Sequence, residues 1–163
     1  MLLAMCAASS ATFAMPVGVQ RTVPCDESIQ TTPFPYLGNS QPRFRYRSLL
    51  NAVSVPPAYL QQVVATEQWP WRYWHKAGLG VRARHALTIT VPPRWRTRAA
   101  IDWGNRGGPY ETLHIAACPG SPHSGNAYAG GLYLHPPSAC VPLIFTVDGR
   151  SATIRFGLAT HCR

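Results

Sequence analysis

Residues 141–158 read VPLIFTVDGRSATIRFGL, and this segment decides the fold class. Its Asp148-Gly149 pair is a typical two-residue turn of a β-hairpin, because such a turn needs a positive φ at both positions. Pairing outward from the turn places apolar residues opposite one another on one face: Phe145 with Ala152, Leu143 with Ile154, and Val141 with Phe156. Turn chemistry and apolar register therefore agree, which predicts an antiparallel hairpin with one buried face.

Apolar and polar residues alternate in other segments as well, between turns that are rich in Pro and Gly. This pattern predicts strands at 43–53, 79–84, 86–91, 98–103, 112–118 and 132–135, in addition to the two hairpin strands. About eight closely spaced strands predict an all-β fold, an antiparallel β-sandwich with an immunoglobulin-like arrangement. One short helix is predicted at 57–68, because a first-turn proline is followed by Tyr59, Leu60, Val63 and Val64 along one side.

Length and composition indicate one globular domain after a short leader. The chain has 163 residues, which favours a single domain at 15–163, and its hydrophobic content of 46% is typical of a folded protein. Residues 1–14 are uncharged, small and apolar, and they predict a secretory signal with a cleavage site at Thr12-Phe13-Ala14. The positively charged start of such a signal is missing, so we expect the signal peptide to be truncated at its N-terminal end. A lipid anchor at Cys6 and a buried first strand are the alternatives.

Four cysteines support export to an oxidising compartment, since Cys25, Cys118, Cys140 and Cys162 form an even set. They show no spacing typical of zinc ligands, and we expect neither a metal nor another cofactor. In the hairpin register Cys140 faces Gly157, and an extended chain would carry Cys162 about 16 Å further along the strand. A disulfide needs Cα atoms within about 7 Å. We therefore predict the pairs Cys118–Cys140 and Cys25–Cys162, and a disulfide-stapled fold.

Charge is the next unusual property, because 15 Lys and Arg against 6 Asp and Glu give a formal net charge of +9. Many arginines alternate with apolar residues, which predicts strands with guanidiniums on an outer face. The arginines concerned are Arg43, Arg45, Arg47, Arg82, Arg84, Arg94, Arg96 and Arg98. Asp102 is expected on the same face as Arg96 and Arg98, where it would compensate part of their charge. We interpret these arginines as an anion-binding face, with a plain solvated sheet face as the alternative.

An aromatic run, Trp69-Pro70-Trp71-Arg72-Tyr73-Trp74, is a second candidate site. Exposed aromatic rings stack on sugar rings, so Trp69, Trp71, Tyr73 and Trp74 are candidate sugar-binding residues. The alternative is that these rings cover an end of the sandwich, since Trp is heavily buried on average.

Several short motifs carry a resemblance to other sequences: Pro24-Cys25-Asp26-Glu27, Trp74-His75-Lys76-Ala77-Gly78-Leu79, Trp103-Gly104-Asn105, Ala117-Cys118-Pro119, Asn126-Ala127-Tyr128-Ala129-Gly130-Gly131, and Cys140-Val141-Pro142-Leu143 with Gly157 and Cys162. In these residues the sequence resembles a family of small uncharacterised exported β-rich proteins of high-GC Gram-positive bacteria. The resemblance implies export, a β-rich fold and disulfides, and it implies no activity.

No catalytic motif points to an enzyme, because the chain has no nucleophile elbow, no zinc-protease motif and no phosphate-binding loop. Asp26 and Glu27 are adjacent, and on a strand they would face opposite ways, unlike the paired acids of a glycosidase. We predict a secreted or cell-envelope-associated, non-enzymatic binding module for anionic or carbohydrate polymers, such as wall polymer or polysaccharide. No specific nucleic acid and no transmembrane span are expected. A structural or interaction protein without a ligand site is the alternative. A small secreted hydrolase, with His123 beside Ser121 and Ser124, is a further one.

Overall fold

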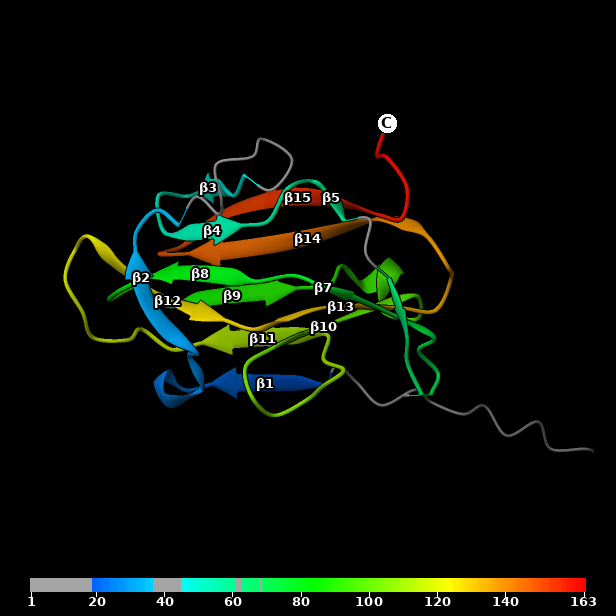
Figure 1. Ribbon diagram of the computed structural model, residues 1–163, viewed down its shortest axis with the longest axis horizontal. Helices are drawn as coiled ribbons and strands as arrows, with labels where there is room; N and C mark the ends of the chain where they lie inside the picture. Colours follow the sequence, from blue (N-terminus) through cyan, green and yellow to red (C-terminus); the bar gives the residue numbers. More distant parts are fainter. Residues whose placement is uncertain (1–18, 37–44, 61–62, 68) are drawn as a thin grey trace, which may run out of the picture.

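The computed structural model describes residues 19–36, 45–60, 63–67 and 69–163, and it confirms an all-β fold (Figure 1). Within these ranges the only helical segments are two short 3-10 turns, Cys25–Glu27 and Pro93–Trp95. The predicted signal at 1–14 and the candidate residue Arg43 lie outside the described residues.

A six-stranded sheet forms one layer, and its order is β1-β11-β9-β14-β15-β5; the first five of these strands follow one another from bottom to top in Figure 1. Its strands are β1 (Gln20–Val23), β11 (Thr112–Ile115), β9 (Leu87–Thr90), β14 (Ala139–Val147), β15 (Arg150–Leu158) and β5 (Tyr59–Leu60). The inner pairs are antiparallel, whereas the pairs β1–β11 and β15–β5 at the two edges are parallel.

Two smaller sheets form the opposing layer. The five-stranded sheet comprises β2 (Gln30–Pro33), β12 (Ser124–Tyr128), β8 (Leu79–Arg82), β4 (Val53–Val55) and β3 (Arg47–Leu49). The four-stranded sheet comprises β10 (Ala99–Trp103), β13 (Gly130–Leu134), β7 (Tyr73–Lys76) and β6 (Val64–Ala65). The chain passes from β7 to β8 through Ala77-Gly78 and from β12 to β13 through Ala129, so two short connections join these two sheets.

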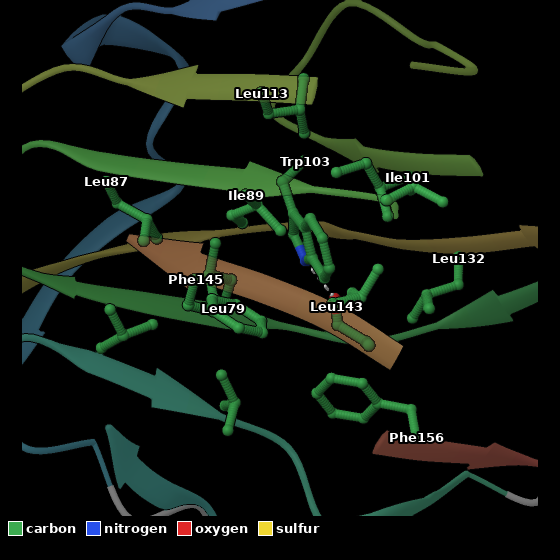
Figure 2. Packing of buried hydrophobic residues seen from close by; sticks show 14 of the residues in the cluster. Leu79, Leu87, Ile89, Ile101, Trp103, Leu113, Leu132, Leu143, Phe145 and Phe156 are labelled. Carbon is green, nitrogen blue, oxygen red and sulfur yellow. Dashed lines mark hydrogen bonds between the residues drawn. The ribbon is translucent and has the colours of Figure 1, made fainter. Parts of the chain in front are cut away.

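One apolar core joins the two layers, as expected for a β-sandwich (Figure 2). Every sheet contributes to it, for example through Phe145 of β14, Leu79 of β8 and Leu132 of β13. Trp103 is the largest fully buried side chain, and its indole Nε1 donates a hydrogen bond to the carbonyl oxygen of Ala77 at 2.8 Å. The polar atom of this ring is therefore satisfied at the junction of the two smaller sheets.

The structure confirms both the strand register of the predicted hairpin and the face that is buried. Leu143 pairs with Ile154 and Cys140 pairs with Gly157 around the Asp148-Gly149 turn. Leu143 is fully buried, whereas its neighbour Ile144 is half-buried on the outer face. The predicted strands at 79–84, 86–91, 98–103, 112–118 and 132–135 correspond to β8, β9, β10, β11 and β13.

Other expectations about the strands are wrong. The helix predicted at 57–68 is replaced by the short strands β5 and β6, whose backbones pair with β15 and β7. The strand predicted at 43–53 is split by a turn at Leu50 and Asn51, both with positive φ. The described residues form fifteen strands in three sheets, so the count of about eight is too low. An immunoglobulin-like arrangement has about seven to nine strands in two sheets, and this topology does not match it.

Both predicted disulfide pairs are also wrong, because Cys25 is bonded to Cys118 and Cys140 to Cys162, with Cα–Cα distances of 5.5 and 5.4 Å. The parallel pairing of β1 with β11 carries Cys25 and Cys118 to the same end of the sheet. The prediction assumed an extended chain after β15. Instead the chain turns at Ala159, which has a positive φ, and brings Cys162 back beside Gly157.

Candidate functional site

The segment 92–98, here called the arginine turn, is not a strand, although its arginines alternate with other residues. Proline lacks the N–H that a sheet ladder needs, so Pro92-Pro93 ends the pairing of β9. The backbone then coils: the N–H of Trp95 bonds to the Pro92 carbonyl, and the N–H of Arg98 bonds to the Trp95 carbonyl, both at 2.8 Å. The coiled backbone places Arg94 and Arg98 at the lining of the same surface depression.

That depression, here called the arginine hollow, has a volume of about 380 Å³. Its lining comes from the arginine turn and from the start of the hairpin: Arg94, Trp95, Arg98, Cys140, Pro142 and Arg155. The guanidinium carbon of Arg98 lies 4.4 Å from the centre of the Trp95 ring, and this stacking fixes its position. The Cys140–Cys162 disulfide ties the C-terminal tail to the hairpin at this place.

The electrostatics of the hollow are one-sided, because three arginines and no acidic residue line it. Arg94, Arg98 and Arg155 are all exposed. Within the described part of the chain, none of their guanidiniums forms a hydrogen bond or an ion pair with the protein. Guanidiniums present a fork of N–H donors that fits carboxylate, sulfate and phosphate groups. The arrangement is therefore suited to bind an anion from solution.

Arg96 belongs to the same turn but has a different role. Its Nε lies 3.1 Å from Oε2 of Glu111 and 3.4 Å from the carbonyl oxygen of Val91. These contacts direct Arg96 away from the hollow and neutralise it. The expected partner of Arg96 and Arg98 was Asp102, and this prediction is wrong, because Asp102 is buried with only 7% exposure.

Asp102 instead lies near a second group of charged residues around Glu27. Arg21 forms an ion pair with Glu27, and the backbone N–H of Asn105 donates to Glu27 Oε2 at 3.0 Å. Burial raises the pKa of Glu27, but the Asn105 hydrogen bond and the two nearby arginines outweigh it and leave the pKa below its ordinary value. Burial raises the pKa of Asp102. Since Glu27 is itself buried and bonded to the loop that follows β10, we interpret this group as structural.

The remaining predicted arginines do not line the hollow. Arg45 is exposed, and Arg47 is half-buried on β3, where burial lowers its pKa. Arg82 donates from Nε to the Pro122 carbonyl at 2.9 Å and from Nη1 to the Asn51 carbonyl at 3.3 Å. Arg84 donates to the Gly120 carbonyl at 2.9 Å. The last two arginines therefore bond to loop carbonyls, and of the eight predicted residues the hollow contains Arg94 and Arg98.

The aromatic run is mostly packed against the protein. Trp71 is 8% exposed and forms a small cluster with Ala100 and Tyr133 outside the main core. The Trp74 ring lies 4.4 Å from that of Tyr133, and Tyr73 packs against the main core. Trp69 is 81% exposed. The structure therefore brings Trp71 and Trp74 together as a partly buried cluster and leaves Trp69 as the open ring of the run.

Of the six lining residues only Arg94 and Arg98 were predicted as site residues, and the missed side chains include Trp95 and Arg155. Arg155 had a usable signal, because the hairpin register places it on the outer face, opposite Pro142. Trp95 lies between two predicted arginines, and a strand there would have pointed it into the core. No local pattern indicates that the arginine turn folds next to the hairpin, since that contact depends on the pairing of β9 with β14.

Comparisons with known proteins do not assign this chain to a family. No protein-family model matches the chain, and no curated protein matches it significantly.

In the part of the chain that the structure describes, no helix has the length and apolar character needed to cross a membrane. The same described residues contain no group of three or more His, Cys, Asp or Glu side chains that could hold a metal ion.

Proposed function

We propose that this protein is an exported, non-enzymatic binding module that holds an anionic polymer of the cell envelope in the arginine hollow. One observation carries the proposal: Arg94, Arg98 and Arg155 converge on one depression without any acidic partner in its lining. Three unneutralised guanidiniums close together favour association with a polyanion, and the net charge of +9 adds long-range attraction.

Export is supported by the two disulfides, since such bonds persist outside the reducing cytoplasm. The uncharged start of the sequence supports the same compartment. A wall polymer or an acidic polysaccharide would be the partner available there. Its acidic groups would be held by bidentate hydrogen bonds from the guanidiniums, with Trp95 keeping Arg98 in place.

The test is elution from immobilised heparin in a salt gradient. The hollow variant carries Arg94→Gln, Arg98→Gln and Arg155→Gln. A matched control carries Arg45→Gln, Arg72→Gln and Lys76→Gln, at exposed basic residues outside the hollow lining. Both variants lose the same formal charge, so a difference between them reports position and not net charge. A thermal melt of each variant checks that folding is retained.

We expect the hollow variant to elute at clearly lower salt than the wild type, and the control variant to elute close to it. Equal shifts in the two variants would show that net charge alone retains the protein, and would overturn the proposal. Failure of the wild type to bind at low salt would also overturn it, and would favour a structural protein without a ligand site.

A further inference from the structure

The outer face of the six-stranded sheet carries two adjacent rows of polar side chains, here called the hydroxyl face. The strand register gives the first row as Thr22, His114, Thr88, Thr146 and Ser151. It gives the second row as Gln20, Thr112, Thr90, Ile144 and Thr153. Residues between them in sequence, such as Ile89 and Phe145, belong to the core, so the rows point away from it. Neighbours are about 4.8 Å apart across strands and about 6.8 Å apart along them.

This face is uncharged and partly ordered by its own hydrogen bonds. Nε2 of His114 lies 3.1 Å from the Gln20 side-chain oxygen, within hydrogen-bond distance. Its Nδ1 is hydrogen-bonded to the Thr88 hydroxyl at 3.1 Å. The Thr146 and Ser151 hydroxyls are hydrogen-bonded to each other at 2.8 Å. None of the ten residues in the two rows is Asp, Glu, Lys or Arg, in contrast to the guanidinium-rich outer side that the sequence suggested.

The second row borders the arginine hollow. Arg155 and Pro142 pair with each other one step beyond Thr153 and Ile144 on the same face, and both line the hollow. Thr90, Ile144 and Thr153 therefore lie side by side on β9, β14 and β15 next to it. Among the described residues, the hydroxyls of Thr90 and Thr153 have no hydrogen-bond partner in the protein. Thr90 is half-buried and Thr153 is exposed, so both hydroxyls are open to a ligand.

We infer that the ligand is an acidic polysaccharide, with its sugar rings on the hydroxyl face and an acidic group in the arginine hollow. This inference rests on the proposed function and narrows its ligand class. Two hydroxyls flank the apolar Ile144, which suits a sugar ring with polar edges and an apolar face. A polyanion without sugars would gain little from this uncharged surface. The charge complementarity of the hollow selects acidic over neutral polysaccharides.

The experiment compares three soluble polymers by isothermal titration: dextran sulfate, neutral dextran, and inorganic polyphosphate. The face variant carries Thr90→Val and Thr153→Val, which remove two hydroxyls and keep the β-branched shape that strands favour. The control variant carries Thr31→Val and Ser48→Ala, at exposed positions on β2 and β3 of the other layer. The hollow variant described above is titrated in parallel, and a thermal melt accompanies every variant.

We expect the face variant to bind dextran sulfate about tenfold more weakly than the wild type, since two hydrogen bonds are lost. Its affinity for polyphosphate should stay unchanged, the control variant should match the wild type, and neutral dextran should bind weakly or not at all. Equal affinity of wild type and face variant for dextran sulfate would overturn the inference while leaving the proposed function intact. Polyphosphate bound as tightly as dextran sulfate, or tight binding of neutral dextran, would also overturn it. If the hollow variant binds both polyanions like the wild type, the proposed function itself fails.

Discussion

The β14–β15 hairpin and the arginine turn both alternate polar and other residues, yet only the hairpin consists of strands. In the hairpin the alternation is joined to a turn that fixes the register, so the inward positions of β14, from Ala139 to Val147, all receive apolar side chains. In the arginine turn the alternation follows Pro92-Pro93, which cannot continue a ladder, and the backbone coils. Period two therefore predicts a strand where turn chemistry agrees with it, and misleads where a proline pair precedes it.

The largest expected effect concerns the two disulfides. The sequence alone predicted that Cys140 of the hairpin pairs with Cys118, whereas the structure pairs it with Cys162. Cys25→Ser with Cys118→Ser opens a link across 93 residues and should lower the free energy of unfolding by about 4–5 kcal/mol. Cys140→Ser with Cys162→Ser opens a link across 22 residues and should cost about 3 kcal/mol. Urea unfolding measures both values.

Peptide mapping of the unreduced protein by mass spectrometry provides the independent check of this pairing. A peptide that links Cys118 to Cys140 would contradict the structure and restore the sequence-based prediction. A reversed order of the two stability losses would instead show that loop length does not govern the effect here.

A core substitution gives the next largest effect and tests the hairpin register directly. Leu143→Ala should lower the free energy of unfolding by about 2–5 kcal/mol, because Leu143 is fully buried opposite Ile154. Ile144→Ala should cost less, since Ile144 is half-buried on the outer face. Urea unfolding of the two single variants decides, and equal losses would mean that the two faces of β14 are assigned wrongly.

The features that the sequence predicted correctly depend on contacts between residues close in sequence, and the features that it missed depend on contacts between distant residues. The hairpin, the all-β class and five further strands depend on neighbours in sequence, and they were predicted. The cysteine pairs depend on the parallel pairing of β1 with β11 and on the reversal at Ala159, neither of which has a local pattern. At the candidate site Arg94 and Arg98 were named for the wrong reason, as strand residues. Arg155 was missed because its contact with them arises from sheet order.

A turn substitution has a smaller expected effect and tests why the hairpin is specified so well. Gly149 has a φ of +73°, and a Cβ placed there would meet nothing within 4 Å. Gly149→Ala should therefore cost about 1–2 kcal/mol from backbone strain alone. Gly107→Ala is the control, since its φ is not in the left-handed range and its nearest contact is 3.9 Å away. A loss in thermal stability as large for Gly107→Ala would show that the positive φ of Gly149 does not explain the cost of Gly149→Ala.

The smallest expected effect distinguishes the two kinds of arginine within the arginine turn. Arg96→Gln removes the contact with Glu111, a partly exposed ion pair, and should lower stability by about 0.2–1 kcal/mol. Arg94→Gln should leave stability unchanged, because no ion pair or hydrogen bond joins Arg94 to the described residues. Heparin elution should show the opposite order, with the larger shift for Arg94→Gln. If Arg96→Gln shifts elution as much as Arg94→Gln at matched net charge, the turn does not sort its arginines into a structural residue and a binding residue. All arginines of the turn would then contribute alike to binding polyanions.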